Sequence, residues 1–157
     1  MLWALIVALI VAADQVSKFI IVRNVKMGEM IEVIQNFFYI TYIRNTGAAW
    51  SILQNGRYFF IVLTIIASMI LIYLLLKSKN RIFSLALCFI LGGAIGNLID
   101  RIAVGSVVDF LEFHFWSYRF PVFNVADTFI TIGAILLAYY LIFIYKEPNE
   151  ATEMEGR

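Results

Sequence analysis

Two aspartates, Asp109 and Asp127, are the side chains in this sequence best suited to carry out chemistry. Asp109 lies in the apolar segment 107–110, and Asp127 starts a run with no further charge until Lys146. An ionised carboxylate at the edge of hydrocarbon is costly, so acids in this position predict a functional site. Hydrolysis of an amide needs a base that activates water and an acid that protonates the leaving nitrogen. Two close carboxylates that share one proton supply both, because close like charges cannot both ionise.

The roles within this pair depend on position. Asp127 is predicted to lie near a helix N-terminus, whose partial positive charge favours an ionised base and leaves Asp109 as the acid. In a coupled pair, however, assigning each role to one residue can lack a firm meaning. Two simpler interpretations stay open. Asn124 and Asp127 could only cap the last helix, and Asp109 could be a loop acid that faces water.

The composition is that of an integral membrane protein. Hydrophobic residues make up 62% and charged residues 15% of the chain, with a mean hydropathy of +0.88. Soluble domains carry about 25% charged residues. The net charge of +1 gives no electrostatic case for binding nucleic acid. A single cysteine, Cys88, excludes an internal disulfide, and one histidine in the whole chain argues against a zinc site. We expect no metal and no cofactor.

Four apolar runs have the length of about 20 residues that crosses a bilayer. The predicted spans are residues 2–22, 58–76, 82–99 and 125–145, all within a single membrane-embedded domain, 1–157. The connectors 23–57 and 102–122 are then on the outer side, and 146–157 is a cytoplasmic tail. The loop 77–81 holds three cations in five residues, so the positive-inside rule places it, and with it both termini, in the cytoplasm.

The first span could also be a cleaved signal peptide. It lacks a basic region before the apolar stretch and a small-residue cleavage site, and it continues past Lys18 into further apolar residues. We therefore expect a helix that is retained.

The two outer connectors differ in character from the spans. Residues 37–43 are aromatic and β-branched, and Asn45-Thr46-Gly47 follows them, which predicts a strand and then a turn. The second connector is rich in aromatic residues of the kind that lie at the headgroup level of a membrane. These are Phe110, Phe113, Phe115, Trp116, Tyr118 and Phe120. We predict a small β-rich platform that lies on the membrane over the helix ends.

Polar residues within the spans share helix faces. One such set is Gly93, Asn97 and Arg101, with Gly92, Gly96 and Asp100 on the neighbouring face; a second is Asn124, Asp127, Thr128 and Thr131; a third is Asp14 and Lys18. The glycines allow helices to approach closely. All three sets map to the outer leaflet, which predicts a polar cavity there.

Several of these residues have a structural alternative. Asp14 and Lys18 are better explained as an ion pair than as catalytic groups, although Asp14 could also orient the site. Asn97 and Arg101 could hydrogen-bond between helices or reach the interface; we favour a role in positioning the aspartates or in binding lipid phosphate and substrate carbonyls. Asn45 could be an ordinary turn residue. His114 is expected to be an interfacial surface residue.

Taken together, the motifs resemble a known family, the bacterial lipoprotein signal peptidases (type II signal peptidases). The motifs are Asp14-Gln15-x-x-Lys18, Asn45-x-Gly47-Ala48-Ala49, Gly93-x-x-x-Asn97-x-x-Asp100-Arg101, Val107-Val108-Asp109-Phe110 and Phe123-Asn124-x-Ala126-Asp127. Each motif alone is weak, but five in the family's order cover essentially the whole chain before the polar tail. No motif position departs from the pattern.

The resemblance implies an all-α bundle of four transmembrane helices with a β-cradle and a short interfacial helix on its outer face. It implies an intramembrane aspartyl endopeptidase in the bacterial cytoplasmic membrane, with its active site near the outer leaflet. The substrates would be prolipoproteins carrying diacylglyceryl on the lipobox cysteine, cut on the amino side of that cysteine, and globomycin would block the enzyme. We expect a monomer in contact with membrane lipid.

The resemblance also assigns roles to residues. Asp109 and Asp127 would be catalytic. The residues that would bind substrate or position the site are Asp14, Lys18, Asn45, Gly47, Asn97, Arg101 and Asn124.

Two other functions remain to be weighed. A small transporter or proton-coupled channel also uses buried acids, but it should place ionisable groups at several depths, and the inner halves of these spans carry none. No internal repeat of the transporter kind is visible either. A lipid-binding assembly factor would need the platform but no paired acids.

Overall fold

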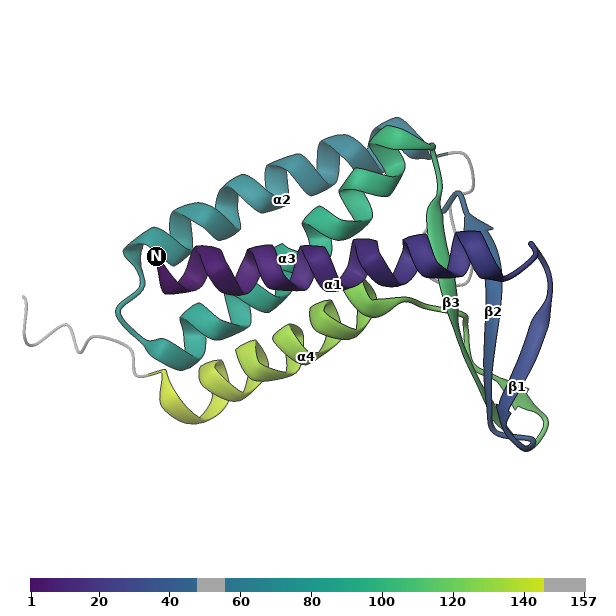
Figure 1. The fold of residues 1–157 in the computed structure, drawn as a ribbon. Coiled ribbons are helices and arrows are strands. Elements are labelled where there is room, and N and C mark those ends of the chain that lie inside the picture. Colours follow the sequence, from purple (N-terminus) through teal and green to yellow (C-terminus); the bar gives the residue numbers. More distant parts are fainter. Residues whose placement is uncertain (48–55, 146–157) are drawn as a thin grey trace, which may run out of the picture.

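Four helices, each long and apolar enough to cross a membrane, dominate the structure (Figure 1). The computed structural model describes residues 1–47 and 56–145. The helices are α1 (Leu2–Asn24), α2 (Arg57–Lys77), α3 (Arg81–Ala103) and α4 (Val125–Tyr139), and a π-helical turn, η2 (Tyr140–Ile144), extends α4. The four predicted helices are confirmed. α3 ends at Ala103 rather than at residue 99, so its last turn carries Asp100 and Arg101.

Asparagine caps explain where α3 and α4 begin. The Asn80 side chain accepts hydrogen bonds from the backbone N–H groups of Ile82 and Phe83, at 2.9 and 3.1 Å. Asn124 caps α4. Such caps satisfy N–H groups that have no partner inside the helix. Because only Ser78–Asn80 separate α2 from α3, these two helices run antiparallel.

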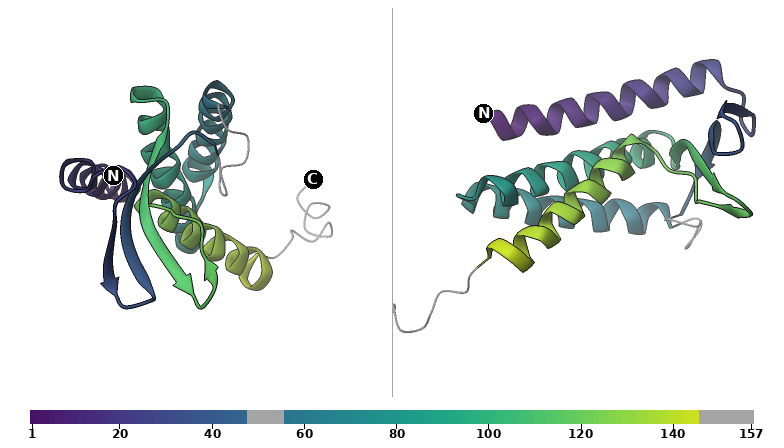
Figure 2. Two further views of the ribbon diagram at one scale, coloured as in Figure 1. Left: turned by 90° about the vertical axis from the view of Figure 1, so that its right-hand side faces the viewer. Right: turned by 90° about the horizontal axis from the view of Figure 1, so that it is seen from below.

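α3 lies at the centre of the bundle and packs against the other three helices (Figures 1 and 2). Glycines make the contact between α3 and α4 close. A Cβ atom added at Gly93 would collide with the Ala126 carbonyl oxygen, and one added at Gly133 would lie 2.8 Å from the Ala86 carbonyl oxygen. Small residues let helices approach in this way within a membrane. The predicted packing role of the α3 glycines is thus confirmed at Gly93.

An antiparallel sheet of four strands lies across one end of the bundle (Figure 1). Its strands, in spatial order, are β1 (Met30–Ile34), β2 (Phe38–Asn45), β3 (Val107–Phe115) and β4 (Tyr118–Arg119). The expected β-rich platform is confirmed, and the predicted strand 37–43 corresponds to β2. Residues 25–47 and 104–124 contain no helix, and residues 48–55, which complete the first connector, lie outside the described residues.

The N-terminus, the loop between α2 and α3, and the end of α4 lie together at the end of the bundle opposite the sheet (Figure 1). This arrangement agrees with the predicted even number of spans. The tail 146–157 lies outside the described residues.

A small apolar core joins α1 to the sheet. It consists of Ile21, Val25, Tyr42, Val108 and Phe110. Side chains alternate along a strand, so Val107 and Asp109 point to the other face of β3. The packing of Val108 and Phe110 therefore aims Asp109 toward the helix ends.

Candidate active site

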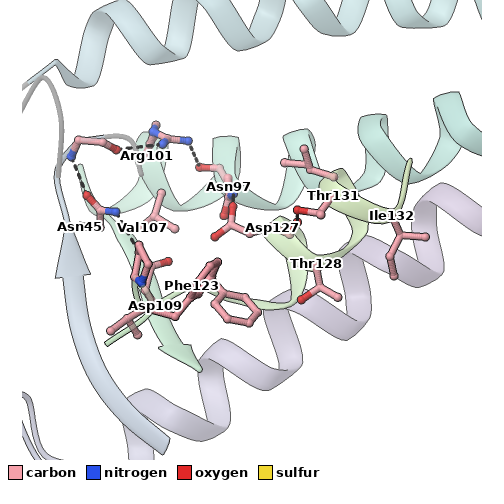
Figure 3. Close-up of a pocket in the computed structure, with 15 residues that line it drawn as sticks. Asn45, Asn97, Arg101, Val107, Asp109, Phe123, Asp127, Thr128, Thr131 and Ile132 are labelled. Atoms are coloured by element: carbon pink, nitrogen blue, oxygen red, sulfur yellow. Dashed lines mark hydrogen bonds between the residues drawn. The ribbon is translucent and has the colours of Figure 1, made fainter. Parts of the chain in front are cut away.

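A pocket of about 460 Å³ lies where the sheet meets the ends of α3 and α4 (Figure 3). Part of its wall is the apolar segment Phe120–Phe123. The predicted site residues that line it are Asn45, Gly47, Asn97, Arg101, Asp109 and Asp127. The other three predicted residues, Asp14, Lys18 and Asn124, are buried beside it.

Asp109 reaches the pocket from β3 and is only 2% exposed. Its Oδ2 accepts a hydrogen bond of 3.0 Å from Asn45 Nδ2, and its Oδ1 accepts one of 2.6 Å from Asn124 Nδ2. Burial, reinforced by the negative charge of Asp127, raises the pKa of the Asp109 carboxyl to about 7 even though these hydrogen bonds oppose the rise. The predicted alternative of a loop acid facing water is wrong, since this carboxyl is buried in a strand.

Asp127 faces the same pocket from the first turn of α4 (Figure 3). Its Oδ1 accepts a hydrogen bond of 2.8 Å from Asn97 Nδ2, and its Oδ2 accepts one of 3.3 Å from the Asn124 backbone N–H. This carboxylate therefore receives donors from two elements. It also stands at a helix N-terminus, where the helix dipole stabilises negative charge.

Asn124 connects the two aspartates. Its Oδ1 accepts from Asp127 N at 2.9 Å while Asp127 returns a bond to its backbone, which makes a complete capping box. The capping interpretation is confirmed, but it is not the whole role of this residue. The Nδ2 group of Asn124 also donates to the Asp109 carboxyl, so this fully buried residue binds one carboxyl group through its side chain and the Asp127 carboxyl group through its backbone N–H.

Lys18 lies at the centre of a buried ionic network behind the pocket. Its Nζ is 2.8 Å from Asp14 Oδ2, which confirms the expected ion pair, and 3.0 Å from Asp100 Oδ2. It also donates to Asn97 Oδ1 at 2.9 Å. The three donors of the ammonium group are thereby used. Asn97 in turn links this network to Asp127.

Sequence reasoning did not assign roles to two members of this network, Asp100 and Gln15. Asp100 is 6% exposed, and Gln15 Nε2 lies 3.0 Å from Asp100 Oδ1 and 3.1 Å from Asp14 Oδ2. The signal for Asp100 was present, because the sequence places this acid on the helix face next to that of Asn97. Gln15 was marked only as a member of the motif Asp14-Gln15-x-x-Lys18, and nothing in the sequence indicated that it would bridge two helices.

Arg101 and Gly47 form one rim of the pocket. The Arg101 guanidinium donates to the Gly47 carbonyl oxygen at 3.3 Å and lies 5.0 Å from the centre of the Phe60 ring. Asn45 Oδ1 accepts from the Gly47 backbone N–H at 2.9 Å, so the predicted turn is present alongside the contact with Asp109. Ala48 and Ala49 of the same motif lie outside the described residues.

His114 lies on the opposite face of β3 from Asp109. Its Nε2 is 2.8 Å from Glu112 Oε1, and its ring lies against that of Tyr39, with the centroids 4.3 Å apart and the planes tilted by 34°. His114 does not line the pocket.

The fold and site define a polytopic membrane protein with a pocket of carboxyl, amide and guanidinium groups at one end of its helix bundle. The model of the family described as signal peptidase (SPase) II matches residues 6–143. The chain belongs to this family, and it is a membrane protease of lipoprotein processing. The resemblance inferred from the five motifs is therefore confirmed.

Individual relatives agree over nearly the whole chain. The lipoprotein signal peptidase of Listeria monocytogenes serotype 4a is 47% identical over 143 residues, which cover 90% of this chain and 93% of that protein. The enzyme of the same name from Enterococcus faecalis is 47% identical over 148 residues, covering 93% and 91%. A solved structure described as a bacterial membrane enzyme is 41% identical, with a TM-score of 0.85 and coverage of 94% and 93%.

Proposed function

We propose that the chain is an intramembrane aspartyl endopeptidase that removes signal peptides from diacylglyceryl-modified prolipoproteins. It cleaves on the amino side of the lipidated cysteine. The observation that carries the aspartyl mechanism is the hydrogen bonding of Asn124 to both Asp109 and Asp127 at one pocket. Family membership and the names of the relatives support the substrate class.

In this mechanism Asp127 is the base and Asp109 is the acid. Asp127 takes a proton from a water molecule as the water oxygen bonds to the scissile carbonyl carbon. Asp109, whose raised pKa keeps a proton available near neutral pH, protonates the leaving nitrogen as the carbon–nitrogen bond breaks. The proton on Asp127 then returns to Asp109, which restores the pair.

The surrounding groups suit an extended peptide next to lipid. The peptide bonds of a transmembrane helix are hydrogen-bonded within the helix and are not accessible to catalytic groups. The scissile segment of the substrate must therefore unwind at the membrane edge. Arg101 and Asn45 at the rim would bind its carbonyl oxygens. The apolar wall, which includes Phe120, Ile130 and Ile132, would contact the apolar part of the substrate.

Cleavage of a lipidated substrate by the purified protein tests the proposal. A preprolipoprotein with diacylglyceryl on its cysteine should release its signal peptide, and globomycin should block this release. The same protein without the lipid is the matched control and should stay intact. Equal cleavage of both forms would contradict a requirement for the lipid, and cleavage of neither would contradict the proposed activity.

We predict that activity against a lipidated peptide is bell-shaped in pH. At low pH both carboxyl groups are protonated and no base remains. As the pH rises through about 7, Asp109 loses the proton that it must donate, so activity falls on the alkaline side. A histidine has an ordinary pKa of about 6.5, so His114→Ala is the necessary control. If that substitution removed the alkaline limb, the limb would belong to His114 and the shared-proton mechanism would lose its main support.

We further propose that the sheet and the pocket lie on the outer side of the cytoplasmic membrane, with both termini in the cytoplasm. Cysteines introduced at Ser78 and Asn149 in a Cys88→Ala background should resist impermeant thiol reagents in intact cells, whereas one at Asn36 should react. Ser78 directly follows α2, and Asn36 lies in the connection between β1 and β2, which is at the opposite end of the molecule (Figure 1). Labelling at Ser78 but not at Asn36 would invert this topology.

A further inference from the structure

We infer that Gln15 is a positioning residue that sets the spacing of the Asp109 and Asp127 carboxyl groups. The inference rests on the catalytic role proposed for these two aspartates. Gln15 does not line the pocket. It acts through two other carboxylates, Asp14 and Asp100, each of which holds the backbone directly before one member of the pair.

The first of these attachments fixes Asp127. Asp14 on α1 is fully buried, and its Oδ1 accepts a hydrogen bond of 2.9 Å from the Ala126 backbone N–H. Ala126 directly precedes Asp127 and lies in the first turn of α4, where backbone N–H groups need external partners. A carboxylate from α1 thus anchors the start of α4.

The second attachment fixes Asp109 in the same way. Asp100 at the end of α3 accepts a hydrogen bond of 3.1 Å from the Val108 backbone N–H through its Oδ2. Val108 directly precedes Asp109 on β3. The position of Asp109 in the pocket wall therefore depends on the position of the Asp100 carboxylate.

Gln15 and Lys18 join the two attachments. Asp14 and Asp100 carry like charges in a buried setting, and Lys18 supplies one positive charge between them. The third N–H donor of Lys18 goes to Asn97, so the ammonium group has no donor left for the second oxygen of Asp100. The Gln15 amide provides the remaining link. Its Nε2 lies 3.1 Å from Asp14 Oδ2 and 3.0 Å from Asp100 Oδ1, and its two hydrogens are shared with a third acceptor, the Gly96 carbonyl oxygen on α3, at 3.1 Å.

This geometry predicts what the loss of the amide would do. Without it, the Asp100 Oδ1 atom loses the hydrogen bond that ties it to α1, and the Asp14 and Asp100 carboxylates are held together by Lys18 alone. Their repulsion then allows the two attachments to move apart. A shift of about 1 Å between catalytic groups is enough to lower a rate by about 100-fold.

The test compares two substitutions of Gln15 with a control on the same helix turn. Gln15→Met keeps the length of the side chain but removes the amide. Gln15→Asn keeps the amide but shortens the side chain by one methylene, so that it cannot reach both carboxylates. The control is Ser17→Ala, because Ser17 Oγ donates to the backbone oxygen of Asp14 rather than to its carboxylate.

Both Gln15 variants should lower kcat by about 10- to 100-fold with little change in KM. The alkaline limb of the activity profile, assigned to Asp109, should move to lower pH by about half a unit, because greater exposure of this carboxyl to water lowers its pKa. The charged groups that act on Asp109 are Asp127, Lys18 and Arg101, and none of them is altered. The Ser17→Ala protein should keep the kcat and the profile of the unmodified enzyme.

Normal kcat and an unmoved alkaline limb in either folded Gln15 variant would overturn the inference. Lower activity that only follows a smaller folded fraction, or failure of both variants to fold while Ser17→Ala folds, would make Gln15 a structural residue and overturn it as well. Failure of the proposed function would look different. In that case the unmodified enzyme would not cleave, or its Asp109→Asn or Asp127→Asn variant would.

Discussion

Replacing Asp109 or Asp127 by asparagine is expected to abolish cleavage of a lipidated prolipoprotein while the protein stays folded and still binds its substrate. Asparagine has nearly the shape of aspartate but can neither take up nor release the catalytic proton. Because each role in general acid–base catalysis contributes about 10² to 10⁴ in rate, each variant should lose at least about 10³-fold in kcat when the pair acts as a unit. The measurement is single-turnover cleavage in detergent, with substrate binding measured separately.

Glu112→Gln is the matched control for these variants. Glu112 is a buried acid on β3 like Asp109, but it points to the opposite face and pairs with His114. Its replacement should leave kcat within a few-fold of the unmodified enzyme. Near-normal turnover by Asp109→Asn or Asp127→Asn would remove that residue from the mechanism, whatever the control showed.

Replacing Lys18 by methionine should lower the stability of the folded protein strongly. Methionine fills much of the same volume, but Asp14 and Asp100 would then be buried without a cation. Removing one partner of a buried ion pair costs about 3 to 5 kcal/mol, because the remaining charge is left uncompensated. The Lys18 side chain is only 4% exposed, so solvent cannot replace it. The melting temperature in detergent should therefore fall by several degrees or more.

The control is Lys77→Met, at the end of α2, where the ammonium lies 5.9 Å from the Tyr73 ring. A cation–π contact at an exposed site is worth about 0.5 to 1 kcal/mol, so the melting temperature should change far less than for Lys18→Met. Adding Asp100→Asn to Lys18→Met should recover part of the lost stability, since it removes one of the two unpaired charges. Equal melting temperatures for Lys18→Met and Lys77→Met would show that the buried network contributes no net stability.

Some features of this protein follow from local properties of the chain. The four helices could be predicted because a run of about 20 apolar residues suits hydrocarbon whatever its neighbours are. Asp109 and Asp127 stood out for a similar reason, since the cost of a carboxylate in apolar surroundings belongs to that residue and needs no partner to be recognised. The turn at Asn45 and the cap at Asn124 are also local, because the side chain bonds to backbone within three residues of itself.

Other features depend on contacts between distant segments, and the pattern of residues along the chain does not contain them. β2 pairs with β3 across more than sixty residues of sequence, and this pairing brings Asn45 to Asp109. The expected pair of Asp14 and Lys18 became a network with Asp100 and Gln15 once α1 and α3 were packed together. Periodicity defines the polar face of each helix, but the rotation and depth of one helix against another are set by close contacts such as that of Gly93 with Ala126. Those contacts exist only in the folded bundle, which is why Gln15 acquires its partners only there.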